Sequence, residues 1–127
     1  MIPLYKQNKN KQDKLNIVTG IEYETGRIID GQKEYAKRVD CGFLNSGTIS
    51  VPYNIQNIKL ITKFEGNFYN INSKSTYIIP RSYPSNAEAY NVDCNISIPN
   101  GTIILTSGTN YDGSTFKAIV TIYYIKS

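Results

Sequence analysis

The chain has 127 residues, 40% of them hydrophobic, and carries a formal net charge of +4. This length fits one domain with a core of its own, since domains usually contain about 100–200 residues. The chain contains no histidine, which excludes triads of the Ser-His-Asp type and removes the commonest metal ligand.

The positive charge is concentrated near the N-terminus. Residues 1–20 contain four lysines and one aspartate, which leaves 10 of the basic and 9 of the acidic residues for 21–127. A nucleic-acid domain needs a surplus of Lys and Arg on one face to displace counterions. Residues 21–127 lack that surplus, so we expect no nucleic-acid partner.

Residues 1–20 are expected to form an extended N-terminal arm, and 21–127 the folded domain. The arm is polar and basic in its middle, and its few apolar residues cannot offset the entropy cost of ordering it. Ile2, Leu4 and Tyr5 at its start are the side chains that can dock on a partner. The alternative is a frayed terminus with no role.

Two absences bear on location and redox state. Residues 1–15 lack the apolar core of a signal peptide, and no stretch approaches the roughly 20 apolar residues of a membrane span. We therefore expect synthesis in the cytoplasm and no membrane contact. Thiols stay reduced there, so Cys41 and Cys94 are interpreted as two small buried hydrophobic side chains.

Turn residues divide 21–127 into short strands. Asp30-Gly31 accepts the positive φ angles of a two-residue hairpin turn between strands at 26–29 and 33–39. A second hairpin is predicted around 72–75, and Pro99-Asn100-Gly101 ends a strand over 90–98. Helix formers are scarce. The pattern predicts an all-β fold, an antiparallel β-sandwich of the jelly-roll type with about eight strands.

Alternation of apolar and polar residues assigns faces to three strands. In 58–65, Ile58, Leu60 and Phe64 are expected on the buried face. In 90–98 the alternation places Cys94 inside. Both faces of 116–125 are apolar, which indicates a central strand or a subunit contact, and this is the first indication of a homo-oligomer.

The loops contain the residues typical of a binding surface. Tyrosine supplies rigid aromatic area, and Asn and Asp supply adaptable hydrogen bonds, a combination that suits sugars. The alternative for any one tyrosine is a filler at the rim of a sheet. No acid–base pair or activated thiol is indicated, so we expect no enzyme, no catalytic residue, no metal and no cofactor. The candidate ligand-binding residues are Tyr83, Asn86, Asn110, Tyr111 and Asp112.

Two segments resemble a family of phage proteins. Thr25–Gly42, TGRIIDGQKEYAKRVDCG, is similar to a segment of bacteriophage tail, baseplate and fibre-tip proteins, with Lys33 one place late and Glu34 where the pattern has an aliphatic residue. The ending AIVTIYYIK, Ala118–Lys126, resembles their closing strand. Together the two segments bracket most of the folded domain.

The resemblance implies a small β-sandwich, usually trimeric, on the outside of a virion and without enzyme activity. The expected function is an appendage of the tail, fibre or baseplate that contacts the host surface, with a host-surface glycan as ligand. In this interpretation Ile2, Leu4 and Tyr5 anchor the chain to other virion proteins. The alternatives are a capsid head-fibre or decoration protein with no host ligand, and a stand-alone carbohydrate-binding module.

Overall fold

The computed structural model describes residues 16–82 and 89–127, and this part of the chain is all-β, as expected. Its strands follow the predicted turns, and they are all paired antiparallel. The strands are β1 (Tyr23–Ile29), β2 (Gln32–Pro52), β3 (Ile58–Asn70), β4 (Thr76–Ile79), β5 (Val92–Ser97) and β6 (Thr102–Lys126).

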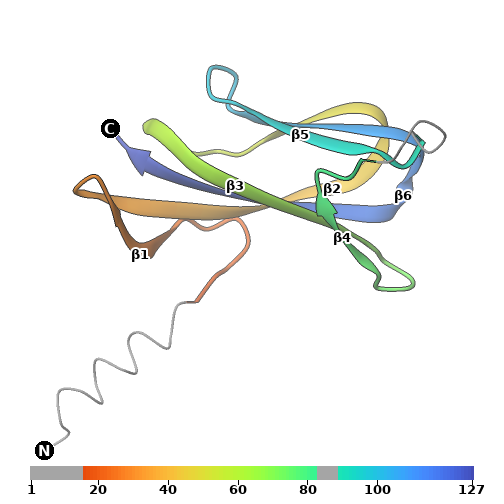
Figure 1. Cartoon of the computed structure of the whole chain (residues 1–127), viewed down its shortest axis with the longest axis horizontal. Coiled ribbons are helices and arrows are strands. Elements are labelled where there is room, and N and C mark those ends of the chain that lie inside the picture. Colours follow the sequence, from red (N-terminus) through yellow and green to blue (C-terminus); the bar gives the residue numbers. More distant parts are fainter. Residues whose placement is uncertain (1–15, 83–88) are drawn as a thin grey trace, which may run out of the picture.

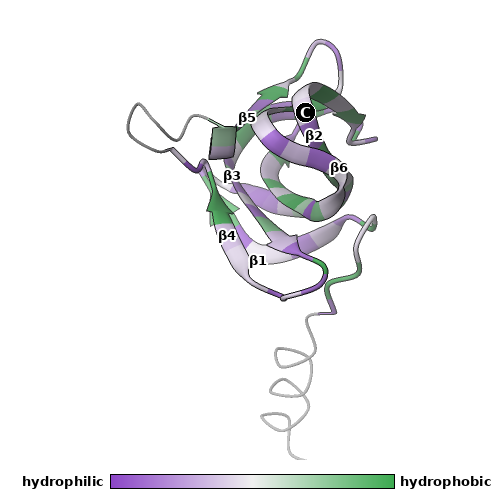
Figure 2. Cartoon of the chain, turned by 90° about the vertical axis from the view of Figure 1, so that its right-hand side faces the viewer, coloured by the Kyte–Doolittle hydropathy of each residue, from purple (hydrophilic) through white to green (hydrophobic). Residues whose placement is uncertain are grey.

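The strands form one sheet that curls on itself. Its order is β1-β2-β6-β3-β4, and β5 pairs with the first part of β6. The second part of β6 lies between β2 and β3. Seen from the end, β2, β3 and β6 wind around the interior (Figure 2). A single bridge between Arg81 and Val92 links the end of β4 to β5, so the two ends of the curl are joined.

The predicted hairpin turns are confirmed. Asp30 and Gly31 have φ angles of 49° and 76°, which is the geometry of the turn expected between β1 and β2. Tyr69 pairs with Thr76 across the second hairpin, and Ser97 pairs with Thr102 across the third. Local turn chemistry therefore identified all three connections.

The described residues contain six strands where about eight were expected, and the jelly-roll sandwich is not confirmed. β2 extends the strand expected at 33–39 as far as Pro52, and β6 continues through Asn110, Tyr111 and Asp112, which were expected in a loop. Register shifts interrupt β2 around Gly42, Asn45 and Gly47, where the two glycines have positive φ angles. Such bulges bend a strand without ending it, so one long strand follows the curl from one side to the other (Figure 1).

The core lies inside the curl. In β6, one face points into this core: Ala118, Val120, Ile122 and Tyr124 are buried, and Phe116 packs against them. Val92 of β5 packs into the same cluster, and Cys94 is half-buried against it. Central position in one sheet therefore accounts for the two-sided apolar character of β6, since its other face is also partly covered. The buried cluster comprises Val39, Cys41, Leu44, Tyr53, Phe68, Ile79, Val92, Ile103, Leu105, Tyr111, Ala118, Val120, Ile122 and Tyr124.

The face assignment of 58–65 was wrong in part. Leu60 and Phe64, expected in the core, are 54% and 42% exposed. Register shifts occur between Ile58 and Leu60 and again between Ile61 and Lys63. Because side chains alternate with a period of two, the first shift moves Leu60 to the opposite face, and the second restores the original face, so Phe64 lies opposite the buried Ile122 and is exposed on the core side. Ile58 packs on the core as expected, and Ile61 does so in place of Leu60.

Candidate functional site

Five of the sequence-predicted site residues lie outside the described part of the chain. Tyr83 and Asn86 fall in 83–88, and Ile2, Leu4 and Tyr5 fall in 1–15. Their roles stay predictions. Of the expected arm, only residues 16–20 are described, and the amide of Gly20 donates to the carbonyl of Arg38 at 2.7 Å. The arm therefore joins the domain beside β2.

Tyr111 belongs to the core and not to a binding loop. Its ring is 2% exposed and contacts Phe68 and Phe116, with ring centroids 5.7 Å and 5.3 Å away. Its hydroxyl donates to the carbonyl of Tyr90 at 2.7 Å. The loop prediction failed because β6 continues through these residues, so the side chain follows strand alternation. A ring buried in this way offers no face to a sugar.

Asn110 and Asp112 are exposed on the opposite side of β6. The Asp112 carboxylate accepts hydrogen bonds from the amide of Ser114 at 2.9 Å and the hydroxyl of Thr115 at 3.0 Å. These bonds hold the pKa of Asp112 below its usual value. The structure thus separates Tyr111 from its two neighbours, and the predicted set does not form one site.

The described residues place no reactive thiol at the surface. Burial raises the pKa of Cys41 to about 12 and that of Cys94 to about 11, so both thiols are protonated near neutral pH. Both are free cysteines in contact with the core cluster. Within residues 16–82 and 89–127, no group of three or more His, Cys, Asp or Glu side chains is placed to hold a metal ion.

Glu34 is a fully buried carboxylate, and its oxygens are occupied. Oε1 accepts from Thr25 Oγ1 at 2.9 Å, and Oε2 accepts from Thr62 Oγ1 at 2.8 Å. Arg27 Nε lies 3.7 Å from Oε1. Because Thr25 is in β1 and Thr62 in β3, this carboxylate ties three strands together. The arrangement indicates a structural role.

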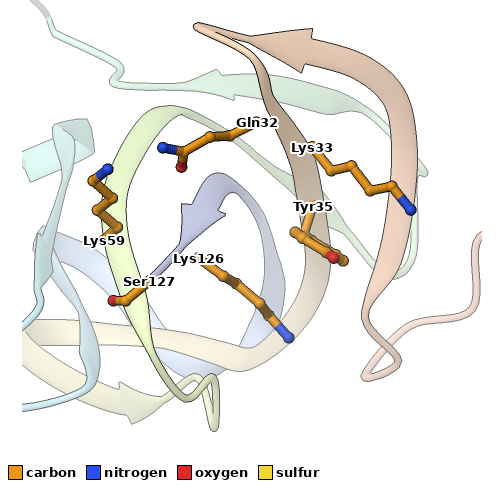
Figure 3. Close-up of a pocket in the computed structure, with 6 residues that line it drawn as sticks. All are labelled: Gln32, Lys33, Tyr35, Lys59, Lys126 and Ser127. Carbon is orange, nitrogen blue, oxygen red and sulfur yellow. The ribbon is translucent and has the colours of Figure 1, made fainter.

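A hollow of about 600 Å³ lies beside the C-terminal end of β6. It is lined by three lysines, and the amine of Lys59 points away from those of Lys33 and Lys126 (Figure 3). Lys126 is paired with Glu22 at 2.6 Å, and Lys33 with Glu24 at 3.3 Å. Paired and diverging amines do not form a cage for an anion. The lining residues are Gln32, Lys33, Tyr35, Lys59, Lys126 and Ser127.

A more promising site lies on the outer face, which we define as the side of β2, β6, β3 and β4 that points away from the core. Residues directly opposite one another in an antiparallel sheet share a face. One row on this face is Arg38, Thr121 and Glu65. The next row begins at Asp40 and continues through Ile119, Asn67 and Ile78.

These two rows border a groove of about 440 Å³, which we call the outer groove. Gly66 of β3 lies opposite Ile79 of β4. A Cβ at Gly66 would lie only 3.2 Å from the Cβ of Ile79, so the missing side chain lets the two strands pack closely here. Ile79 is buried in the core, while its neighbour Ile78 is 76% exposed at the rim. The groove is lined by Arg38, Phe64, Glu65, Gly66, Asn67, Ile78, Ile79, Ile119 and Thr121.

Arg38 is the unpaired charge of the outer groove. Its Nε atom is buried and has no hydrogen-bond partner among the described residues. The other charges of this face are compensated, since Glu65 pairs with Lys63 at 3.0 Å and Asp40 with Lys117 at 3.7 Å. A buried donor without an acceptor costs about 1–3 kcal/mol. This cost makes Arg38 the strongest indication of a binding site.

Sequence reasoning did not identify the outer groove. Phe64 was assigned to the core, and Arg38 and Asn67 were not singled out. The alternation of β6, with Ile119 and Thr121 opposite its core face, was the only available signal. Two bulges in β3 and the pairing of four strands bring these residues together, and neither is visible as a local motif.

A scan against protein-family models, a search of curated proteins and a search of solved structures give no match. No helix in the described residues is long and apolar enough to cross a membrane. The outer groove therefore rests on the geometry of this chain alone.

Proposed function

We propose that the chain is a structural protein of a bacteriophage particle, an appendage of the tail, fibre or baseplate that contacts the host surface. The observation that carries this proposal is the resemblance of Thr25–Gly42 and Ala118–Lys126 to such proteins, together with their placement. The two segments are neighbours in the sheet, with Ala36 opposite Tyr123 and Val39 opposite Val120. The curled sheet then takes the place of the small β-sandwich of those proteins.

A role in binding and assembly is supported by the surface. Ile17, Val18 and Ile21 are 46%, 47% and 60% exposed where the N-terminal segment joins the domain. Apolar side chains gathered on a surface mark contacts with other proteins. We propose that this region and the preceding arm attach the chain to its neighbours in the particle, which leaves the outer face free.

No catalytic role is proposed. The Cys41 thiol is buried and the Cys94 thiol half-buried, both are protonated near neutral pH, and the Glu34 carboxylate is held by two threonines and an arginine. General acid–base catalysis needs a group that can exchange protons with a substrate. A binding protein needs only a shaped surface, which the outer groove provides.

The proposal is tested by peptide mass spectrometry of gradient-purified particles produced from the genome that encodes this chain. We expect its peptides at a constant ratio to those of the known structural proteins. Peptides found only in the soluble lysate would contradict the proposal and favour a free carbohydrate-binding module. A head-fibre or decoration protein would be incorporated but would show no ligand in the test below.

A further inference from the structure

We propose that the outer groove binds a saccharide that carries a carboxylate, and that Arg38 binds the carboxylate. This inference rests on the proposed function, because it names the ligand class of a host-contacting surface. It moves the binding site from the loops around Tyr83 and Tyr111 to the exposed face of the central strands. The argument starts from the unpaired guanidinium.

Arg38 requires an acceptor that the described residues do not supply. Its Nε–H is buried and lacks a partner among the described residues, while the half-buried side chain lines the groove, where the outer guanidinium N–H groups can bind a carboxylate. Glu65, across Thr121 in the same row, is already paired with Lys63. An incoming carboxylate is therefore the group that best satisfies Arg38.

The remaining lining matches the other groups of a sugar. Asn67, Thr121 and Glu65 offer an amide, a hydroxyl and a carboxylate for hydrogen bonds to hydroxyl groups. Ile78 at the rim offers exposed apolar surface for the C–H face of a ring. A groove of about 440 Å³ lies within the usual 300–1,000 Å³ range of small-molecule sites.

The charge balance favours a monoanion. Arg38 contributes one positive and Glu65 one negative charge to the lining, and Asp40 lies in the neighbouring row. A phosphate dianion would meet repulsion from these carboxylates that a single carboxylate, held at Arg38, largely avoids. An acidic peptide shares the carboxylate but leaves the hydroxyl-binding groups without partners, and it is the alternative that the experiment must reject.

The test is a titration of the isotope-labelled full chain, followed by amide NMR shifts, with glucuronate, N-acetylneuraminate and neutral glucose. We expect at least one of the acidic sugars to shift the amides of β3, β4 and β6 around the groove, and glucose to bind more weakly. Arg38→Gln should weaken acidic-sugar binding by about ten- to a hundredfold, because a charge-assisted hydrogen bond is lost. Lys117→Gln, a charge removed from the same face outside the groove, should leave the affinity within about twofold.

Several outcomes would overturn the inference. These are glucose binding as tightly as the acidic sugars, unchanged binding by a folded Arg38→Gln variant, and binding of an aspartate-containing peptide but of no sugar. The amide spectrum of the variant checks its folding. If Arg38→Gln misfolds, the less drastic Asn67→Ala and Thr121→Val variants decide, and unchanged sugar binding in both would reject the site.

Failure of this inference can be distinguished from failure of the proposed function. Particles that carry Arg38→Gln should contain the protein at the normal ratio but adsorb poorly to host cells. Particles that contain the protein without any sugar binding would overturn the ligand and leave the structural role. Sugar binding by a chain absent from particles would overturn the structural role and leave the site.

Discussion

At the scale of single residues, the fold depends on a carboxylate in an unusual place. Glu34 is fully buried at a position where an aliphatic residue would be ordinary, yet Thr25 and Thr62 donate to its two oxygens. A buried charge is tolerated only when it is paired and hydrogen-bonded. Glu34 therefore makes the contact between β1 and β3 specific, at the cost of desolvating a charge.

Removal of the Glu34 carboxylate should lower the stability of the fold. We expect Glu34→Ala to lower the free energy of unfolding by about 2–4 kcal/mol, because it removes the acceptor of two half-buried threonine hydroxyls and opens a cavity. Urea unfolding followed by circular dichroism measures the change. Glu24→Ala, which removes an exposed carboxylate paired with Lys33 in the same hairpin, is the matched control and should change stability by less than about 1 kcal/mol. Equal effects of the two variants would argue against the structural role of Glu34.

The buried thiols predict the alkaline stability of the chain. Burial raises the pKa of Cys41 to about 12 and that of Cys94 to about 11, from 9.0. Between pH 9 and 11 the unfolded chain loses thiol protons that the folded chain keeps, so stability falls as pH rises. Each thiol contributes up to about 1.4 kcal/mol per pH unit in this window. Unfolding measured at pH 8, 9 and 10 should show the loss, and a Cys41→Ala variant should show a shallower one.

At the scale of elements, the long strand β6 organises the sheet. Its first part pairs with β2 and β5, and its second part with β2 and β3. Curvature comes from bulges in its partners, so the chain makes a curled sheet from fewer and longer strands than the pattern of turns indicated. The edge strand β4 is held by only four residue pairs to β3, and its position depends on Ile79.

The missing side chain of Gly66 leaves room for Ile79 of β4. A Cβ at this position would lie 3.2 Å from Ile79 Cβ and 3.4 Å from Val120 Cγ2, and both side chains are buried and cannot retreat. We expect Gly66→Ala to destabilise the fold by about 1–3 kcal/mol and to displace β4. Thermal unfolding and the amide shifts of Thr76–Ile79 measure the two effects. Asn67→Ala, one residue along on the exposed side, should leave both nearly unchanged, and the opposite ranking would refute this account of Gly66.

At the scale of the whole molecule, the open question is assembly. The two apolar faces of β6 indicated an oligomer, but one face fills the core and the other is partly covered within the chain. The exposed Ile17, Val18 and Ile21 at the base of the arm are the better support for contacts between copies. The trimer stays a prediction.

Light scattering coupled to size-exclusion chromatography tests the predicted trimer directly. We expect a mass near three times 14.3 kDa, because three chains bury the apolar base of the arm more completely than one. Deletion of residues 1–15 should leave the trimer intact but abolish incorporation into particles, as expected of an anchoring arm. A monomeric full chain, or unchanged incorporation of the deletion variant, would contradict the corresponding part of the proposal.

The amino-acid sequence by itself determined the local features of this protein. Asp30-Gly31 specified a hairpin because its backbone tolerates positive φ angles, and the apolar residues of 116–125 identified a strand in the middle of the fold. The absence of histidine and the scarcity of helix formers bounded the chemistry and the fold class. These features depend on residues close together in the chain, so they can be read without a structure.

Only the tertiary structure decided the features that depend on pairing between distant segments. A bulge in β3 exposed Leu60, and the continuation of β6 buried Tyr111, because strand register is set by the partner strand and not by local alternation. The outer groove needs β2, β3, β4 and β6 side by side. Arg38 stands out as unpaired only when every neighbour is in place, which is why no local pattern identified it.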